Sequence, residues 1–260
     1  MDVAALVASL APVLDGAVIA TDFDGTLAPL QRDPQDSRPV EGSLAALTAL
    51  AERGAHIAVI TGRDAHTVLR LGGLATVPGL TVAGLYGAET WAEGELSTPD
   101  TPPAMESLQD QLPSVLADAY PDPDVWVEDK RLSLVVHVRR TADPDGALAA
   151  LHDPVRGLAE DLELEMHPGA HVLELRLPGI DKAGALSRLV DEHDPRGVLY
   201  LGDDLGDLPA FAEIARLRDA GRTAWSVGVL SSSADAVRDA CDVTVPDPRA
   251  VVTLLRALAQ

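Results

Sequence analysis

Short, continuous apolar runs alternate with segments of helical spacing at both ends of the chain. Such runs are typical of parallel strands buried on both faces, and alternation of strand and helix favours crossover units of a parallel sheet. Strands are predicted in the run that starts at Val18 and ends in the acids at 22 and 24, and at 56–60, 80–85, 197–201, 223–229 and 242–245. Helices are predicted at 2–14, at 43–53, after residue 181 and at 249–258.

The middle of the chain has a different rhythm. Between Thr98 and Pro103 the composition turns to Pro, Thr and Asp, which indicates a boundary. Beyond it we predict a helix at 104–120, strands at 125–128 and 132–139, a helix at 145–161, and strands at 162–167 and 171–177. Two helix-plus-hairpin units suggest a small α+β insert. The predicted organisation is a discontinuous, doubly wound α/β core, residues 1–103 and 179–260, that carries a cap domain at 104–178.

Composition limits the classes of partner. The chain has 260 residues, of which 47% are hydrophobic, and can bury a substantial core. Its formal net charge of -21 argues against nucleic acid and anionic membranes as partners, and no apolar stretch approaches the roughly 20 residues of a membrane span. Cys241 is a lone cysteine, and the N-terminus lacks the basic start of a signal peptide. We expect a cytoplasmic, monomeric protein whose partner is a small molecule.

The first candidate for chemistry is the pair Asp22 and Asp24, at the end of the first buried strand. Open α/β sheets bind their ligands at the carboxyl ends of strands. Residues i and i+2 of an extended segment point to the same side, so two like charges would share one site and would need a cation or a shared proton. Taken alone, Asp-x-Asp is more often an Asp-rich turn. The full Asp-x-Asp-Gly-Thr after an apolar strand is more specific.

A second acidic group follows the strand at 197–201, where Asp203, Asp204 and Asp207 fall within five residues. A helix N-terminus enriched in acids is the alternative interpretation. Together with Asp22 and Asp24, however, the group indicates a metal site, since Mg²⁺ prefers carboxylate, phosphate and water oxygens. Of 20 basic residues only Lys130 and Lys182 are lysines. A compact ammonium group suits a tight phosphate site.

The run from Asp22 to Thr26 resembles the nucleophile motif of the haloacid dehalogenase superfamily, most of whose members are Mg²⁺-dependent phosphatases. The resemblance implies that Asp22 is a nucleophile that becomes an aspartyl phosphate, and that Asp24 is the general acid and base. It further implies that Thr61 bonds a phosphoryl oxygen and that Lys182 offsets phosphate charge. The implied metal-binding residues are Asp22, Asp24 (through its backbone carbonyl), Asp203, Asp204 and Asp207.

Further motifs narrow the resemblance. They are Gly84-Leu85-Tyr86-Gly87-Ala88-Glu89, Glu128-Asp129-Lys130 with Ser133, His137 and Arg139, Glu174-Leu175-Arg176, and Asp181-Lys182. This series is similar to that of trehalose-6-phosphate phosphatases and spans nearly the whole chain. By this resemblance Glu128, Lys130 and Glu174 grip the sugar hydroxyls, with Arg63 and His137 nearby. The fold implied is a haloacid-dehalogenase-like core with a sugar-recognition cap, and the activity implied is hydrolysis of trehalose 6-phosphate with Mg²⁺ as cofactor.

The chain departs from that family pattern at four positions. Gly206 and Leu208 stand where the family usually has Thr and Glu, Ala183 where it has Gly, and Tyr86 where it often has His. Because Asp22, Asp24, Lys182 and Asp203 are kept, we expect catalysis, and the departures bear on sugar specificity and the metal surroundings. The alternatives left open are a phosphatase or mutase acting on another sugar phosphate, a phosphoaccepting receiver module, and a non-catalytic trehalose-phosphate sensor.

Overall fold

The computed structural model describes residues 2–98, 100–130, 132–230 and 234–260. The chain divides into two compact units. The first comprises Met1–Thr98 together with Asp181–Gln260, and the second is Pro99–Ile180. The predicted cap range, 104–178, lies within the second unit.

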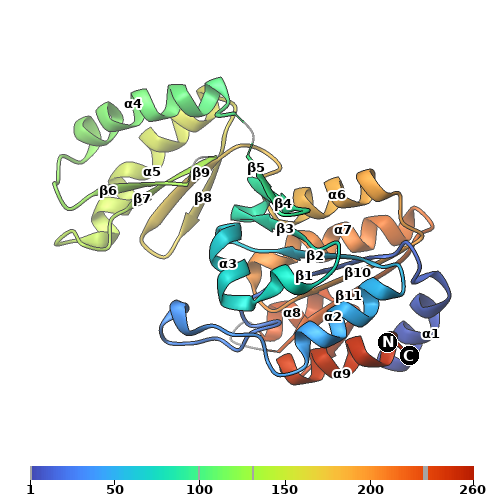
Figure 1. Cartoon of the computed structure of the whole chain (residues 1–260). Coiled ribbons are helices and arrows are strands. Elements are labelled where there is room, and N and C mark those ends of the chain that lie inside the picture. Colours follow the sequence, from blue (N-terminus) through green and yellow to red (C-terminus); the bar gives the residue numbers. More distant parts are fainter. Residues whose placement is uncertain (1, 99, 131, 231–233) are drawn as a thin grey trace. The chain divides into compact units, whose positions relative to one another are not determined.

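The first unit is built on a mixed sheet, in which the described residues form eight strands (Figure 1). In spatial order these are β12 (Val243–Val245), β11 (Thr223–Val229), β10 (Gly197–Gly202), β1 (Val18–Thr21), β2 (His56–Ile60), β3 (Thr81–Gly84), β4 (Glu89–Ala92) and β5 (Glu95–Ser97). The strands from β12 to β3 run parallel, whereas β4 and β5 add an antiparallel hairpin at one edge. In the centre Val18 pairs with Val198 on one side and with His56 on the other.

Helices cover both faces of this sheet. They do so because the side chains of successive residues in the central strands point to opposite faces, and the side chains on both faces are apolar. Ile19 and Ile57 face one side, together with α1 (Val3–Leu10), α2 (Ser43–Glu52), α3 (Ala65–Gly72) and α9 (Pro248–Leu258). Val18 and Val198 face the other, together with α6 (Lys182–His193), α7 (Leu208–Asp219) and α8 (Ala234–Ala240). This confirms the predicted doubly wound α/β class. No helix in the described part of the chain is long and apolar enough to cross a membrane.

The second unit is an antiparallel sheet with its helices on one face. The strand order is β6 (Trp126–Asp129), β7 (Ser133–His137), β9 (Val172–Arg176) and β8 (Glu165–Gly169). Leu134, Val136, Leu173 and Leu175 pack against α4 (Pro103–Ala119) and α5 (Pro144–Asp161). The alternate positions, which carry most of the polar side chains of the sheet, therefore lie on the opposite face.

Several elements differ from the prediction. The predicted helix at 2–14 ends as an α-helix at Leu10 and continues as the 3₁₀ helix Ala11–Val13. Helices α3, α7 and α8 and the hairpin β4–β5 were not predicted. Short 3₁₀ helices also occur in connections: Pro34–Asp36, Leu74–Thr76, Leu85–Gly87 and Leu205–Asp207.

Candidate active site

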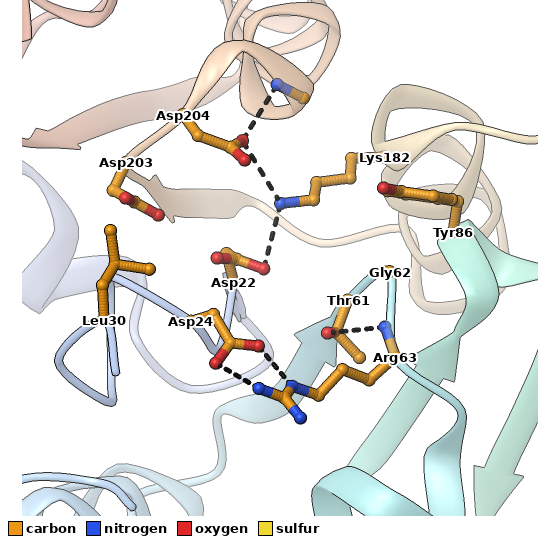
Figure 2. Close-up of a pocket in the computed structure, with 11 residues that line it drawn as sticks. Asp22, Asp24, Leu30, Thr61, Gly62, Arg63, Tyr86, Lys182, Asp203 and Asp204 are labelled. Atoms are coloured by element: carbon orange, nitrogen blue, oxygen red, sulfur yellow. Dashed lines mark hydrogen bonds and ion pairs between the residues drawn. The ribbon is translucent and has the colours of Figure 1, made fainter. Parts of the chain in front are cut away.

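A polar cavity of about 310 Å³ opens where β1, β2 and β10 end (Figure 2). The parallel register of these strands brings their carboxyl ends to one edge of the sheet, so the residues that follow each strand meet there. Seven of the predicted site residues line the cavity: Asp22, Asp24, Thr61, Arg63, Lys182, Asp203 and Asp204. Tyr86 and Gly206, two of the departures from the family pattern, line it as well.

Asp22 and Lys182 form the buried centre of the cavity. Lys182, the first residue of α6, places its Nζ 2.9 Å from Oδ1 of Asp22. Burial acts to lower the pKa of Lys182, but the carboxylates of Asp22 and Asp207 outweigh it and raise that pKa. Burial also raises the pKa of Asp22 well above its ordinary value; Lys182 opposes this rise, whereas Asp207 and Asp203 add to it. One ammonium group thus faces more carboxylates than it can neutralise.

Asp203 approaches the nucleophile motif closely because residue 25 is glycine. A Cβ at Gly25 would lie 2.0 Å from Oδ2 of Asp203, and Gly25 also has a φ of +82°, which disfavours other residues. The Thr26 hydroxyl donates to Oδ1 of Asp203 at 3.5 Å. The sequence Asp-Gly-Thr therefore supplies both the turn and the space that let Asp203 enter the site.

Asp24 is held by two neighbours. The Arg63 guanidinium contacts both of its carboxylate oxygens, with Nη2 donating to Oδ1 at 2.8 Å and Nε donating to Oδ2. The Ser37 hydroxyl also donates to Oδ1, at 2.8 Å, and accepts from Arg63 Nη2 at 3.1 Å. The Asp24 hydrogen bond is the first cause of the raised pKa of Arg63, which keeps the guanidinium charged. Arg63 was predicted as a substrate ligand, and the structure places it on the predicted general acid.

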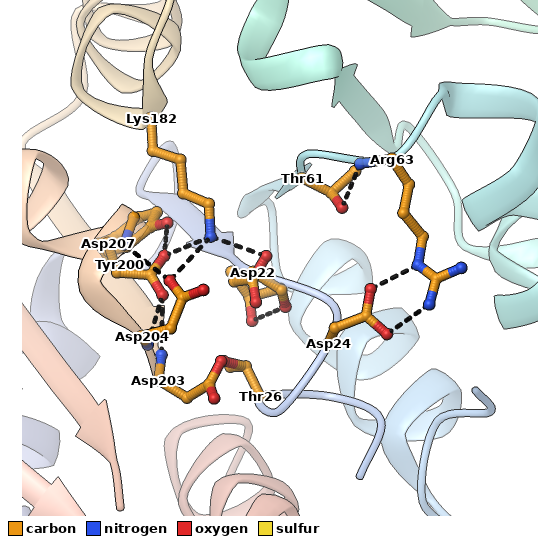
Figure 3. Close-up of polar contacts among 12 residues, drawn as sticks. Asp22, Asp24, Thr26, Thr61, Arg63, Lys182, Tyr200, Asp203, Asp204 and Asp207 are labelled. Carbon is orange, nitrogen blue, oxygen red and sulfur yellow. Dashed lines mark hydrogen bonds and ion pairs between the residues drawn. The ribbon is translucent and has the colours of Figure 1, made fainter. Parts of the chain in front are cut away.

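Asp207 lies behind the cavity and is fully buried (Figure 3). Its Oδ1 accepts from Lys182 Nζ at 2.7 Å and from the Tyr200 hydroxyl at 2.6 Å. Its Oδ2 accepts from the backbone N–H groups of Asp203 and Asp204, at 2.9 and 3.0 Å. Burial acts to raise the pKa of Asp207, but Lys182, Tyr200 and the Asp204 N–H outweigh it, and the pKa is lowered.

Carboxylates at this site fit a divalent cation. Within the described residues, Asp22, Asp203 and Asp207 form a buried group in which one oxygen from each lies within 4.8 Å of the others. Hard oxygen ligands of this kind suit Mg²⁺, and a cation would balance the excess negative charge around Lys182. Asp204 lies at the rim, since 55% of its side chain is exposed and its Oδ1 accepts from the Gly206 N–H.

The remaining predicted site residues belong to the second unit. Glu128 on β6 and Glu174 on β9 both pair with Val135 of β7, so they flank it on the same face of the sheet. His137 lies on this face too, where it stacks on Trp126 at 3.8 Å and contacts Glu128 through Nε2 at 2.9 Å. Lys130 follows β6, and its N–H donates to the Ser133 carbonyl at 2.9 Å.

Three residues at the first unit's site were not predicted. Ser37 lies in a polar, proline-containing loop with no motif, and Thr26 belongs to the nucleophile motif without a predicted role of its own. Tyr200 lies within the apolar run of β10 and looks like a core residue in the sequence. A buried tyrosine hydroxyl usually requires a hydrogen-bond partner, which is the signal that could have identified it.

The core and its acidic site define a haloacid-dehalogenase-like α/β fold. A haloacid dehalogenase-like hydrolase from Bacteroides thetaiotaomicron has this fold, with a TM-score of 0.64 and 16% sequence identity over 92% of this chain and 98% of its own. The trehalose-phosphatase family model matches residues 20–247. The chain belongs to the trehalose-phosphatase family.

Its relatives support this assignment. A trehalose-phosphate phosphatase of Mycobacterium avium is 40% identical over 200 residues, which cover 73% of this chain and 49% of the relative. The chain thus spans about half the length of the curated relatives it matches. A trehalose-6-phosphate phosphatase of Aspergillus fumigatus has the same fold over 100% of this chain and 97% of its own, with a TM-score of 0.79 and 24% identity.

Proposed function

We propose that this chain is a Mg²⁺-dependent phosphatase that converts trehalose 6-phosphate and water into trehalose and phosphate. The observation that carries the proposal is the buried Lys182 ammonium group that bridges Asp22 and Asp207 beside Asp203. The family match and the activity for which the relatives are named supply the substrate.

In the first step an oxygen of Asp22 attacks phosphorus, and the bond between phosphorus and the sugar oxygen breaks. Asp24 protonates the departing oxygen, so trehalose leaves and an aspartyl phosphate remains on Asp22. Since both Asp24 oxygens are bonded to Arg63 or Ser37, one of these bonds must be exchanged for the leaving oxygen. In the second step Asp24 takes a proton from water, the water oxygen attacks phosphorus, and phosphate and free Asp22 are released.

Other residues bind the phosphate group and the cation and orient Asp22. Lys182 offsets phosphate charge and fixes Asp22, and the Thr61 hydroxyl, which accepts from the Arg63 N–H at 3.2 Å, is available to donate to a phosphoryl oxygen. Asp22, Asp203 and the Asp24 carbonyl would hold Mg²⁺, with Asp204 and Asp207 as the surrounding acids. When bound, the cation offsets the repulsion between the Asp22 carboxylate and the phosphate anion.

For the sugar we propose Glu128, Lys130, His137 and Glu174 of the second unit; Arg63, which the family resemblance also assigned to the sugar, is bonded to Asp24. The three of these that lie within strands share one sheet face, and carboxylate, ammonium and imidazole groups suit hydroxyls that both donate and accept. The cytoplasmic location and the monomeric state stay predictions; size-exclusion chromatography with light scattering tests the second.

Phosphate release from a panel of sugar phosphates, with Mg²⁺ and with EDTA, tests the proposal. We expect Mg²⁺-dependent release, fastest from trehalose 6-phosphate. Preference for another sugar phosphate would keep the mechanism and change the substrate. Binding of trehalose 6-phosphate without turnover would indicate a sensor.

A further inference from the structure

The buried side of the site contains a tyrosine that the reaction does not itself require. Tyr200 lies in the middle of β10, is fully buried, and is absent from the cavity lining. Its ring meets that of Phe211 edge-on, with centroids 5.8 Å apart, inside the core that α6 and α7 form with the sheet. A phenylalanine would fill this space equally well, so packing does not account for the hydroxyl.

The hydroxyl has a partner in Asp207, at 2.6 Å from Oδ1. Removing a hydroxyl from water is costly unless it forms a hydrogen bond, and bonds to a charged acceptor are stronger than neutral ones. The pKa of Tyr200 is raised, mainly by burial and then by the charge on Asp207, so Tyr200 remains a neutral donor. Its contribution to the site must therefore pass through Asp207.

Asp207 connects three parts of the site. Four donors converge on its two oxygens: Lys182 Nζ, the Tyr200 hydroxyl, and the N–H groups of Asp203 and Asp204. A carboxylate has about four acceptor positions, so these bonds fill Asp207 and leave it poorly suited to bind a cation directly. Figure 3 shows Lys182 reaching between this group and Asp22.

We propose that Tyr200 is a positioning residue: its hydroxyl fixes the Asp207 carboxylate, which in turn sets Lys182 against Asp22 and holds the backbone that presents Asp203. This rests on the proposed function, since Asp22, Lys182 and Asp203 are the groups that it serves. Without the hydroxyl, Oδ1 of Asp207 keeps Lys182 as its remaining side-chain donor among those described, and the carboxylate loses one of its four hydrogen bonds. Lys182 then moves towards Asp207 and away from Asp22, and the Asp203 turn loosens.

Tyr200→Phe removes the hydroxyl and keeps the ring. We expect kcat for trehalose 6-phosphate to fall roughly 10-fold with little change in KM, because loss of a group that orients metal ligands costs roughly 10–100-fold in affinity or activity. Calorimetric titration with Mg²⁺ in the absence of substrate should show a Kd raised by a similar factor. Tyr120→Phe is the matched control: it removes a hydroxyl from a partly buried residue at the end of α4 in the second unit.

A double-mutant cycle with Asp207→Ala, which removes both acceptor oxygens, separates positioning from packing. If Tyr200 acts through Asp207, Tyr200→Phe should change neither Mg²⁺ affinity nor kcat further in the Asp207→Ala background. Wild-type kcat and Mg²⁺ affinity in Tyr200→Phe, or equal losses in both backgrounds, would overturn the inference. Failure of the proposed function is a different result: wild-type protein would not turn over, while the Mg²⁺ titrations of the same variants would still decide the role of Tyr200.

Discussion

At the scale of single residues, the site holds more carboxylates than its one buried ammonium group, Lys182, can neutralise. Lys182 faces Asp22, Asp204 and Asp207 at 2.9, 4.0 and 2.7 Å, with Asp203 beside them. The acids themselves could be predicted, because each follows an apolar strand in a recognisable motif. Their partners could not, since Asp24 and Arg63 are 39 positions apart and no sequence pattern links them. Tyr200 was missed because a tyrosine in an apolar strand satisfies every expectation for a core residue.

The nucleophile gives the first prediction. Asp22→Asn should lower phosphate release at least roughly 10³-fold, because an amide does not attack phosphorus. The fold should persist, since the amide has nearly the same size and relieves the excess of negative charge. Phosphate release and circular dichroism measure the two effects. Asp110→Asn, at an exposed position on α4, is the control. Substantial turnover by purified Asp22→Asn would remove Asp22 from the nucleophile role.

The cation gives the second prediction. EDTA should stop turnover and added Mg²⁺ restore it, and Asp203→Asn should raise the Mg²⁺ concentration needed for half-maximal rate by roughly 10-fold or more, since a charged ligand is lost. Titrating Mg²⁺ into both proteins and following phosphate release measures the shift, with Asp219→Asn, exposed at the end of α7, as the control. Full activity after EDTA treatment would contradict the metal assignment.

At the scale of elements, the parallel strands were predictable because each is a continuous apolar run between polar segments. The elements that were not predicted mostly have weaker patterns in the sequence. Helix α3 has only 8 residues, and the β4–β5 hairpin turns at Glu93 and Gly94, both with positive φ, without an Asn-Gly or Asp-Gly pair. Helix α7 has Phe211, Ile214 and Leu217 at helical spacing, which is a signal for a helix that the sequence does contain. The motif ending in Glu89 supports the start of a helix, because Glu89 Oε1 accepts the N–H of Ala65, the first residue of α3.

Two elements meet at a pair of histidines, which gives a prediction of pH dependence. His56, the first residue of β2, stacks on His193, the last of α6, with ring centroids 3.9 Å apart. Burial and then His193 lower the pKa of His56, against opposing effects of Glu192 and Asp15. Below the ordinary histidine pKa of about 6.5, the unfolded chain therefore binds a proton at His56 that the folded chain resists. The stability of the folded protein consequently decreases as the pH is lowered.

His56→Gln should reduce this dependence. Between about pH 7.5 and 5.5 the wild-type protein should lose more unfolding free energy than the variant does, as measured by urea denaturation at each pH. His66→Gln, at an exposed position on α3, should keep the wild-type slope. Equal slopes for wild type and His56→Gln would show that His56 does not titrate differently in the folded and unfolded states.

On the scale of the whole molecule, the chain combines a core that holds the proposed chemistry with a second unit that holds the proposed sugar ligands. The change from parallel-strand runs to helix-plus-hairpin units was visible in the sequence, because the two architectures impose different hydrophobic periods. The shared face of Glu128, His137 and Glu174 depends on the register of three strands. The β6–β7 and β7–β9 pairings fix that register, and the sequence alone left it open.

The division of roles between the two units gives the last prediction. If Glu174 and Lys130 bind the sugar, their loss should matter only for substrates that carry it. A hydrogen bond to a charged group contributes roughly 1.5–3 kcal/mol, which is roughly 10–100-fold in kcat/KM. Glu174→Ala and Lys130→Ala should each lose about that much on trehalose 6-phosphate and keep near-normal hydrolysis of a small aryl phosphate, which has no sugar. Glu106→Ala, exposed on α4, should keep wild-type kcat/KM on both substrates. Equal losses on both substrates would mean that Glu174 and Lys130 support the fold or the phosphate site, because a sugar contact has no effect on a substrate without a sugar.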